Sequence, residues 1–220
     1  DYLERWTACF TSGRRWGLVY EAWHRPEAYL PLGEAIAAYE CRLRCHELGL
    51  SLAGSPYGYP AVGSTMACSA VAYAAAGGMN RRAAGEDFYF LQALAKTGQI
   101  EKIPNLRVYP SGRVSERVPF GTGRAMRQVL DQPAGRSRAY HPEIYRLLRH
   151  VLEAAVLLES GDADTFLTAL KRKSEVLVTF FTRTDFPRVW ERIAANHRQA
   201  PARRLSPPGG RLRSSSPPPR

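Results

Sequence analysis

Apolar residues recur at helical spacing in two segments of the first half of the chain. Over residues 31–50 they return every three or four positions, which predicts a helix that Gly49 ends. Over residues 85–98 they line one face, and Gly98 stands where a helix would stop. Residues 65–73 are short, apolar and bounded by glycines, a pattern that fits either a buried strand or the start of a small-residue helix.

The remaining pattern is mostly helical. Residues 100–109 predict a short strand that Pro104 interrupts, and residues 113–123 predict a loop rich in Gly and Pro. Residues 1–30 are rich in aromatic side chains but have no clean period, so no element is predicted there. Further helices are expected over residues 124–130, 142–160, 163–181 and 186–195.

Three regions follow from this order of elements. Residues 1–132 are expected to form an α/β unit, residues 133–197 a helical appendage, and residues 198–220 a disordered tail. The tail consists largely of Pro, Ser, Gly and Arg, which cannot bury enough apolar surface to offset the entropy lost on ordering. The 220 residues leave room for one full domain, or for part of a larger domain plus tails.

The formal net charge of +11 is concentrated in two arginine blocks. Residues 198–220 hold six Arg and no acid, and residues 107–138 hold seven Arg against two acids, so the rest of the chain is formally neutral. The block inside folded sequence either offers guanidinium groups to phosphate oxygens or is a solvated basic rim. It contains few aromatic residues that could stack on bases, so no nucleic-acid partner is expected.

The cysteines do not indicate a disulfide framework, because four in this length are too few. Cys41 and Cys45 share one face of a predicted helix with His46 beside them, which is one half of a metal-site pattern. No second ligand pair follows at the spacing of a zinc site, so half-buried thiols are the preferred interpretation.

The most informative stretch combines a double glycine with two acids. Gly77 and Gly78 would let the backbone approach a ligand closely, and Glu86 and Asp87 lie in the first turn of a predicted helix. Acids at a helix start are also favoured electrostatically, by up to about 1 kcal/mol each. The arginine-rich segment 109–123 adds a candidate phosphate clamp to a candidate base, and this combination favours group transfer from a phosphorylated donor.

At these residues the sequence resembles the family 2 glycosyltransferases, which have the GT-A fold. The resemblance covers roughly residues 20–130. A subgroup of bacterial enzymes shares the longer runs GGMNRRAAGEDFYFL and RVSERVPFGTG. The resemblance is carried by Gly63-Ser64, Gly77-Gly78-Met79, Gly85-Glu86-Asp87 and the arginine-rich loop behind them.

The resemblance implies an inverting glycosyltransferase that moves a sugar from a nucleotide-sugar donor to a hydroxyl acceptor. Asp87 would be the catalytic base, and base help of this kind is worth about 10² to 10⁴ in rate. Glu86 would support the helix start or touch the acceptor. Arg113 and Arg117 would stabilise the leaving diphosphate or pair with acids such as Glu116. The implied substrate-binding residues are Glu86, Gly63, Ser64, Gly77, Gly78, Arg113 and Arg117.

One large part of the family pattern is missing. A complete GT-A domain begins with a nucleotide-binding half that ends in an Asp-x-Asp motif, which holds Mg²⁺ or Mn²⁺. About 85 residues precede Glu86, without a βαβ pattern or such a motif. Asp162-Ala163-Asp164 matches the Asp-x-Asp pattern, but it follows the end of a predicted helix instead of a strand. Asp162 is therefore expected to be the N-cap of the next helix, and no metal ligand is assigned. A transferase fragment with little or no activity alone is therefore expected.

Two other functions stay open at this point: a polyanion- or nucleic-acid-binding module, and a non-catalytic interaction module built on a decayed enzyme. The helices of residues 140–197 are expected to cover the acceptor cleft, pack on another subunit or lie against a membrane surface. The most apolar stretch, residues 67–79, is too short to cross a bilayer. A cytoplasmic or membrane-peripheral location is expected.

Overall fold

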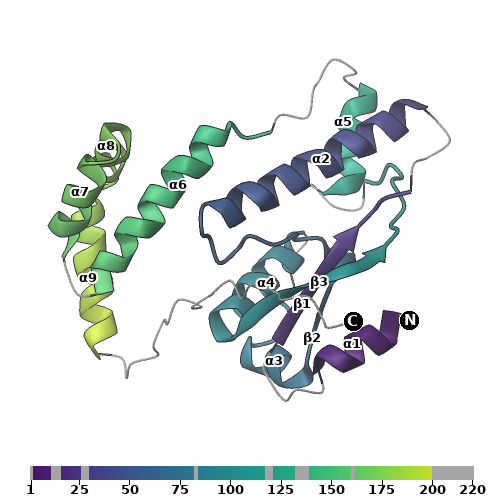
Figure 1. Ribbon diagram of the computed structural model, residues 1–220, viewed down its shortest axis with the longest axis horizontal. Coiled ribbons are helices and arrows are strands. Elements are labelled where there is room, and N and C mark those ends of the chain that lie inside the picture. The colour runs from purple at the N-terminus through teal and green to yellow at the C-terminus, as the bar shows by residue number, and fades with distance from the viewer. Residues whose placement is uncertain are drawn as a thin grey trace, which may run out of the picture.

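A mixed sheet with helices on both faces forms the first part of the chain in the computed structural model (Figure 1). Its central strand β1 (Trp16–Ala22) pairs antiparallel with β2 (Met66–Cys68) and parallel with β3 (Gln99–Val108). The expected mixed α/β class is confirmed. The structure describes residues 2–10, 16–25, 30–81, 84–116, 121–131, 139–159 and 162–199.

The described helices fall into two groups. Those before residue 132 surround the sheet, whereas those after residue 141 pack mainly on one another at one end of the molecule (Figure 1). The first group is α1 (Tyr2–Phe10), α2 (Leu30–Leu52), the 3₁₀ turn η1 (Gly63–Thr65), α3 (Ala70–Ala75), α4 (Glu86–Thr97) and α5 (Thr122–Asp131). The second group is α6 (Pro142–Ala155), the 3₁₀ turn η2 (Val156–Glu159), α7 (Ala163–Lys171), α8 (Glu175–Arg183) and α9 (Phe186–Gln199).

Strand β1 divides its side chains between two cores, because successive residues of a strand point to opposite faces. Val19 packs against α4 through Leu91 and Leu94. Leu18 and Tyr20 face the other way and pack with residues of β3 and α1. Both sets are fully buried, so the strand is apolar on both faces and lacks the alternation that marks a half-exposed strand. This explains why no element was predicted before residue 30.

Strand β3 has the predicted length, begins one residue earlier and passes through Pro104 instead of breaking there. Its pairing shifts register at this point: Val19 pairs with Lys102, but Glu21 pairs with Arg107. The extra residues bulge out of the ladder, where a residue without an N–H group is tolerated. The guanidinium group of Arg5 on α1 donates hydrogen bonds to the carbonyl oxygens of Pro104 and Asn105, at 2.6 and 2.9 Å.

Helix α2 does not end at Gly49, as the sequence predicts, but continues through it to Leu52. Gly49 is buried under the ring of Tyr145 on α6: a Cβ atom added there would lie 2.5 Å from the Tyr145 Cε2 atom. The same tyrosine hydroxyl is 2.8 Å from the Nδ1 atom of His46. The glycine therefore permits close packing of α6 on α2 and is not a stop signal.

Replacing Gly49 by Val is expected to loosen α6 from α2. The new side chain overlaps the Tyr145 ring, and overpacking of this kind costs about 1 to 3 kcal/mol. Faster hydrogen exchange in α6 would measure the loss. Gly54→Val gives the control, since a Cβ atom there meets no atom within 4 Å although its φ of +77° is strained. Equal protection of α6 in the wild type and Gly49→Val would contradict the packing role.

One predicted helix over residues 163–181 is two helices, α7 and α8. The chain turns after Leu170, whose carbonyl oxygen accepts two backbone N–H groups at 2.9 and 2.8 Å. The turn folds α8 and α9 back onto α7, so that the rings of Phe181 and Phe186 lie 5.1 and 4.9 Å from the ring of Phe166. The spacing of apolar residues continues without interruption across this turn, so the sequence pattern did not show the break between the two helices.

Helix α9 ends at Gln199 and so includes the first two residues of the predicted disordered tail. The other residues of that tail lie outside the described residues. None of the helices in the described ranges has the length and apolar character needed to pass through a bilayer.

Candidate functional site

A cleft of about 690 Å³ opens beside the start of α4, and we call it the α4–α5 cleft. Four segments that are far apart in the chain form it. They are the middle of α2 with Tyr39 and Arg42, residues 61–63, residues 84–88, and the first turns of α5. Both predicted acids, Glu86 and Asp87, line this cleft. Its volume falls in the range typical of ligand sites.

The start of α4 sets the positions of Glu86 and Asp87. Gly85 precedes the helix in the left-handed region, with φ of +74°, which suits glycine because it has no Cβ atom. Glu86 and Asp87 follow as the first two helical residues, and both are half-buried. The Asp87 Oδ1 atom accepts a hydrogen bond from the Phe88 N–H group at 2.7 Å. The Asp87 Oδ2 atom lies beside Gly63.

Gly63 leaves room at the Asp87 carboxylate. A Cβ atom added to Gly63 would lie 3.4 Å from the Asp87 Oδ2 atom. A side chain at this position would therefore lie against the Asp87 carboxylate. Gly63 and Asp87 were predicted separately as site residues, and the fold brings them close together. Ser64 is exposed and does not line the cleft.

The described cations of the cleft are Arg42 and Arg124. Arg42 comes from α2, and its guanidinium carbon lies 5.2 Å from the centre of the Tyr39 ring. Arg124 comes from the first turn of α5 and is exposed. Arg124 belongs to the arginine block seen in the sequence, but nothing local marks Arg42, which lies 45 residues before Asp87 in the chain.

The two arginines first predicted as the phosphate clamp are placed differently. Arg113 is exposed and is not among the residues that line the cleft. Arg117 lies outside the described residues. The Glu116 carboxylate, named as an alternative partner for both, is ion-paired with Arg127.

Gly77 and Gly78 end α3 and do not line the cleft. Both have left-handed backbones, with φ of +80° and +77°. Their N–H groups bond to the carbonyl oxygens of Ala74 and Tyr73 at 3.1 and 2.9 Å, which satisfies the helix end. A Cβ atom on Gly78 would lie 3.3 Å from the Tyr73 ring. The double glycine is thus explained by a helix end packed against an aromatic ring.

The residues considered for metal binding have other contacts. Cys41 and Cys45 are exposed, and the hydrogen bond that the Cys45 thiol makes to Cys41 is the main cause that raises the pKa of Cys45. Burial lowers the pKa of His46, which bonds to Tyr145. The Asp162 Oδ1 atom accepts the Thr165 N–H group at 2.8 Å, which confirms the predicted N-cap. Within the described ranges no group of three or more His, Cys, Asp or Glu side chains could hold a metal ion.

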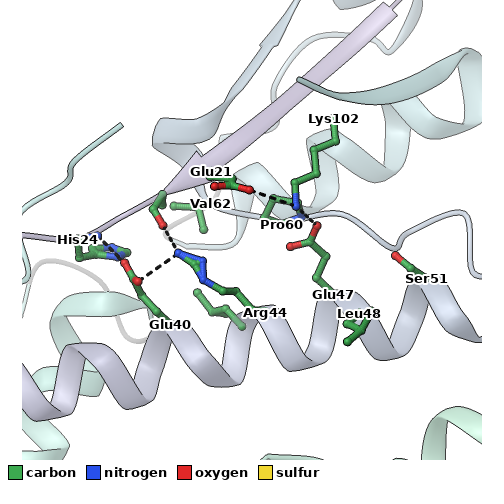
Figure 2. A pocket seen from close by; sticks show the side chains of 12 residues that line it. Glu21, His24, Glu40, Arg44, Glu47, Leu48, Ser51, Pro60, Val62 and Lys102 are labelled. Atoms are coloured by element: carbon green, nitrogen blue, oxygen red, sulfur yellow. Dashed lines mark hydrogen bonds and ion pairs between the residues drawn. The ribbon is translucent and has the colours of Figure 1, made fainter. Parts of the chain in front are cut away.

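A second cavity of about 320 Å³ lies where α2 crosses the sheet, and its charges are mutually paired (Figure 2). The Lys102 ammonium is 2.7 Å from Glu47 and 3.9 Å from Glu21. The Arg44 guanidinium reaches Glu40 at 3.2 Å. The pKa of Glu21 is lowered, first by the hydrogen bond that Trp23 donates and then by Lys102 and Arg107, against the effect of burial. This network joins α2 to the sheet.

Comparisons of the chain with protein-family models, with curated proteins and with solved structures returned no match. The motifs of the sequence and the chemistry of the α4–α5 cleft therefore remain as the indications of function.

Proposed function

We propose that the chain carries the acceptor side and the catalytic base of an inverting glycosyltransferase that uses a nucleotide-sugar donor. The observation that supports this proposal is the composition of one cleft: the carboxylates Glu86 and Asp87 and the guanidinium groups of Arg42 and Arg124 all line it. The transfer of a sugar from a diphosphate donor needs a base and a set of cations, and one cavity holds both.

In this proposal Asp87 takes the proton of the acceptor hydroxyl. The acceptor oxygen forms a bond to the anomeric carbon of the donor sugar as the bond from that carbon to the diphosphate oxygen breaks. The proton ends on the Asp87 carboxylate, and the electron pair leaves with the diphosphate. Arg42 and Arg124 stabilise the negative charge that develops on the leaving group. Gly63 keeps the space beside Asp87 Oδ2 open for the acceptor.

Two of the four described arginines of the arginine block are paired, which weakens the case for a polyanion-binding surface as the main function. Within the arginine block, Arg107 lies 4.5 Å from the Trp23 ring centre and 3.4 Å from Glu21, and Arg127 is paired with Glu116. A polyanion binder leaves its cations facing outward and loses affinity steeply as salt rises. Steep salt dependence of binding to a random oligonucleotide, with no loss in Asp87→Asn, would favour that alternative.

The direct test is the release of nucleoside diphosphate from UDP- and GDP-sugars in the presence of methyl glycosides as acceptors. The protein is assayed as the present chain and with any residues that its gene encodes before Asp1. Release that depends on both donor and acceptor is expected in the longer form if the gene encodes a nucleotide-binding half. Absence of release in both forms with every donor would contradict the proposal.

Arg124→Ala is expected to lower kcat/KM for the donor about 10- to 100-fold, because a cation that stabilises the leaving group is lost. The matched control is Arg113→Ala, which removes an exposed arginine outside the cleft and is expected to leave the rate unchanged. Steady-state kinetics with varied donor measure both. The reverse order of effects would return the clamp to Arg113.

A further inference from the structure

A buried histidine connects the second cavity to the α4–α5 cleft. The side chain of His24, just after β1, is 2% exposed. Its Nδ1 atom lies 2.9 Å from Glu40 Oε1, and its backbone N–H group donates to the same oxygen (Figure 2). On the other side of the ring, Nε2 lies 3.4 Å from the Thr122 Oγ1 atom. Thr122 is the first residue of α5 and lines the cleft that holds Asp87.

The hydrogen-bond partners of Glu40 indicate which nitrogen of the His24 ring carries a proton. The second carboxylate oxygen, Oε2, accepts a hydrogen bond from Arg44 at 3.2 Å, so both oxygens of Glu40 act as acceptors. An ionised carboxylate can only accept, and the Nδ1 atom facing it must therefore carry a proton. In a neutral imidazole the other nitrogen, Nε2, is then an acceptor. With that single ring proton on Nδ1, the proton between Nε2 and Oγ1 comes from the Thr122 hydroxyl, which then donates to the ring.

This assignment determines what Thr122 offers to a ligand. A threonine hydroxyl has one proton and two lone pairs. With the proton directed at His24, only lone pairs remain for a group in the cleft. A sugar hydroxyl can donate to them, whereas a diphosphate oxygen at neutral pH has no proton to give.

We infer that Glu40 and His24 position the Thr122 hydroxyl as a hydrogen-bond acceptor for a hydroxyl group of a carbohydrate acceptor in the α4–α5 cleft. The inference rests on the proposed function, and it divides the cleft: Arg42 and Arg124 receive phosphate, and Thr122 receives a sugar hydroxyl. Glu40 and His24 are positioning residues, because they act on the ligand only through Thr122.

The first experiment identifies the tautomer by ¹⁵N NMR of the histidine ring nitrogens in the full chain. The ring of His24 is expected to carry its proton on Nδ1 and to have Nε2 unprotonated. Thr122→Val removes the hydroxyl and should shift the Nε2 resonance while the Nδ1 proton stays. A proton on Nε2, or a doubly protonated ring, would overturn the inference, because Thr122 could then donate to phosphate. This readout does not depend on any transferase activity.

The second experiment compares two ligands: methyl glycosides of glucose, galactose and mannose, and inorganic pyrophosphate. Thr122→Val is expected to weaken glycoside binding about fivefold to tenfold, the usual worth of one hydrogen bond, and to leave pyrophosphate binding unchanged. A variant that lost pyrophosphate instead, or a wild-type chain that bound none of the glycosides, would overturn the inference.

Two substitutions at His24 provide matched controls. His24→Asn keeps a donor near Glu40 but has nothing to accept the Thr122 proton, so it should show the glycoside defect of Thr122→Val. His24→Gln places an amide oxygen close to the position of Nε2 and should retain part of the affinity. A purely structural contact would lower the melting temperature in both variants without changing the ratio of glycoside to pyrophosphate affinity. If Asp87→Asn kept full turnover while the tautomer and glycoside results held, the proposed function would fail and the positioning would stand.

Discussion

Replacing Asp87 by Asn is expected to lower turnover about 10²- to 10⁴-fold, which is the usual worth of general-base help. Asparagine has nearly the same shape, and its amide oxygen can still accept the Phe88 N–H group that Asp87 Oδ1 accepts at 2.7 Å. The amide cannot take a proton from an acceptor hydroxyl. The start of α4 is therefore preserved while the base is lost.

The measurement is kcat for nucleoside diphosphate release, with donor affinity determined separately by titration. Donor affinity should change little, because Arg42 and Arg124 remain in place. Glu86→Gln is the matched control: it changes the neighbouring acid of the same cleft and is expected to have the smaller effect on kcat. Full turnover in Asp87→Asn, or a larger loss in Glu86→Gln, would remove Asp87 from the role of base.

Replacing Phe166 by Ala is expected to unfold the helical region formed by α6 to α9. The Phe166 side chain is 1% exposed and lies at the centre of the core shared by these helices. Truncating a buried Phe to Ala costs about 3 to 5 kcal/mol. A whole domain is commonly stable by only about 5 to 15 kcal/mol, so a small helical unit would lose most of its stability.

Denaturant titration followed by circular dichroism measures this effect, and tryptophan fluorescence adds a local probe because Trp190 lies in α9. The control is Phe180→Ala, which removes a ring that is 57% exposed on α8 and should cost little. Equal destabilisation by the two substitutions would show that the core is not organised around Phe166.

The helical region contacts the rest of the chain where α6 packs on the second half of α2. Tyr145 covers Gly49 and bonds to His46 there. The α4–α5 cleft uses an earlier part of the same helix, through Tyr39 and Arg42, and none of its described lining residues comes from α6 to α9. Of the three roles expected for these helices, covering the cleft finds no support in the described residues.

Local signals in the sequence were sufficient for α4 and for the N-cap of α7. The helix over residues 85–98 is present as α4 with both acids in its first turn. The N-cap at Asp162 follows from the same kind of rule, since its partner Thr165 is three residues away. Capping and helical periodicity act over one or two turns, and a single segment contains all the atoms involved.

The tertiary structure alone decided which distant residues meet. Gly63, Arg42 and Thr122 join Asp87 in one cleft because separate helices and loops pack around the sheet. Gly49 is a residue type that commonly ends a helix, but here it lies within α2, where the Tyr145 ring packs against it. These contacts arise from close packing of segments that lie up to about a hundred residues apart, and no short stretch of sequence contains both partners.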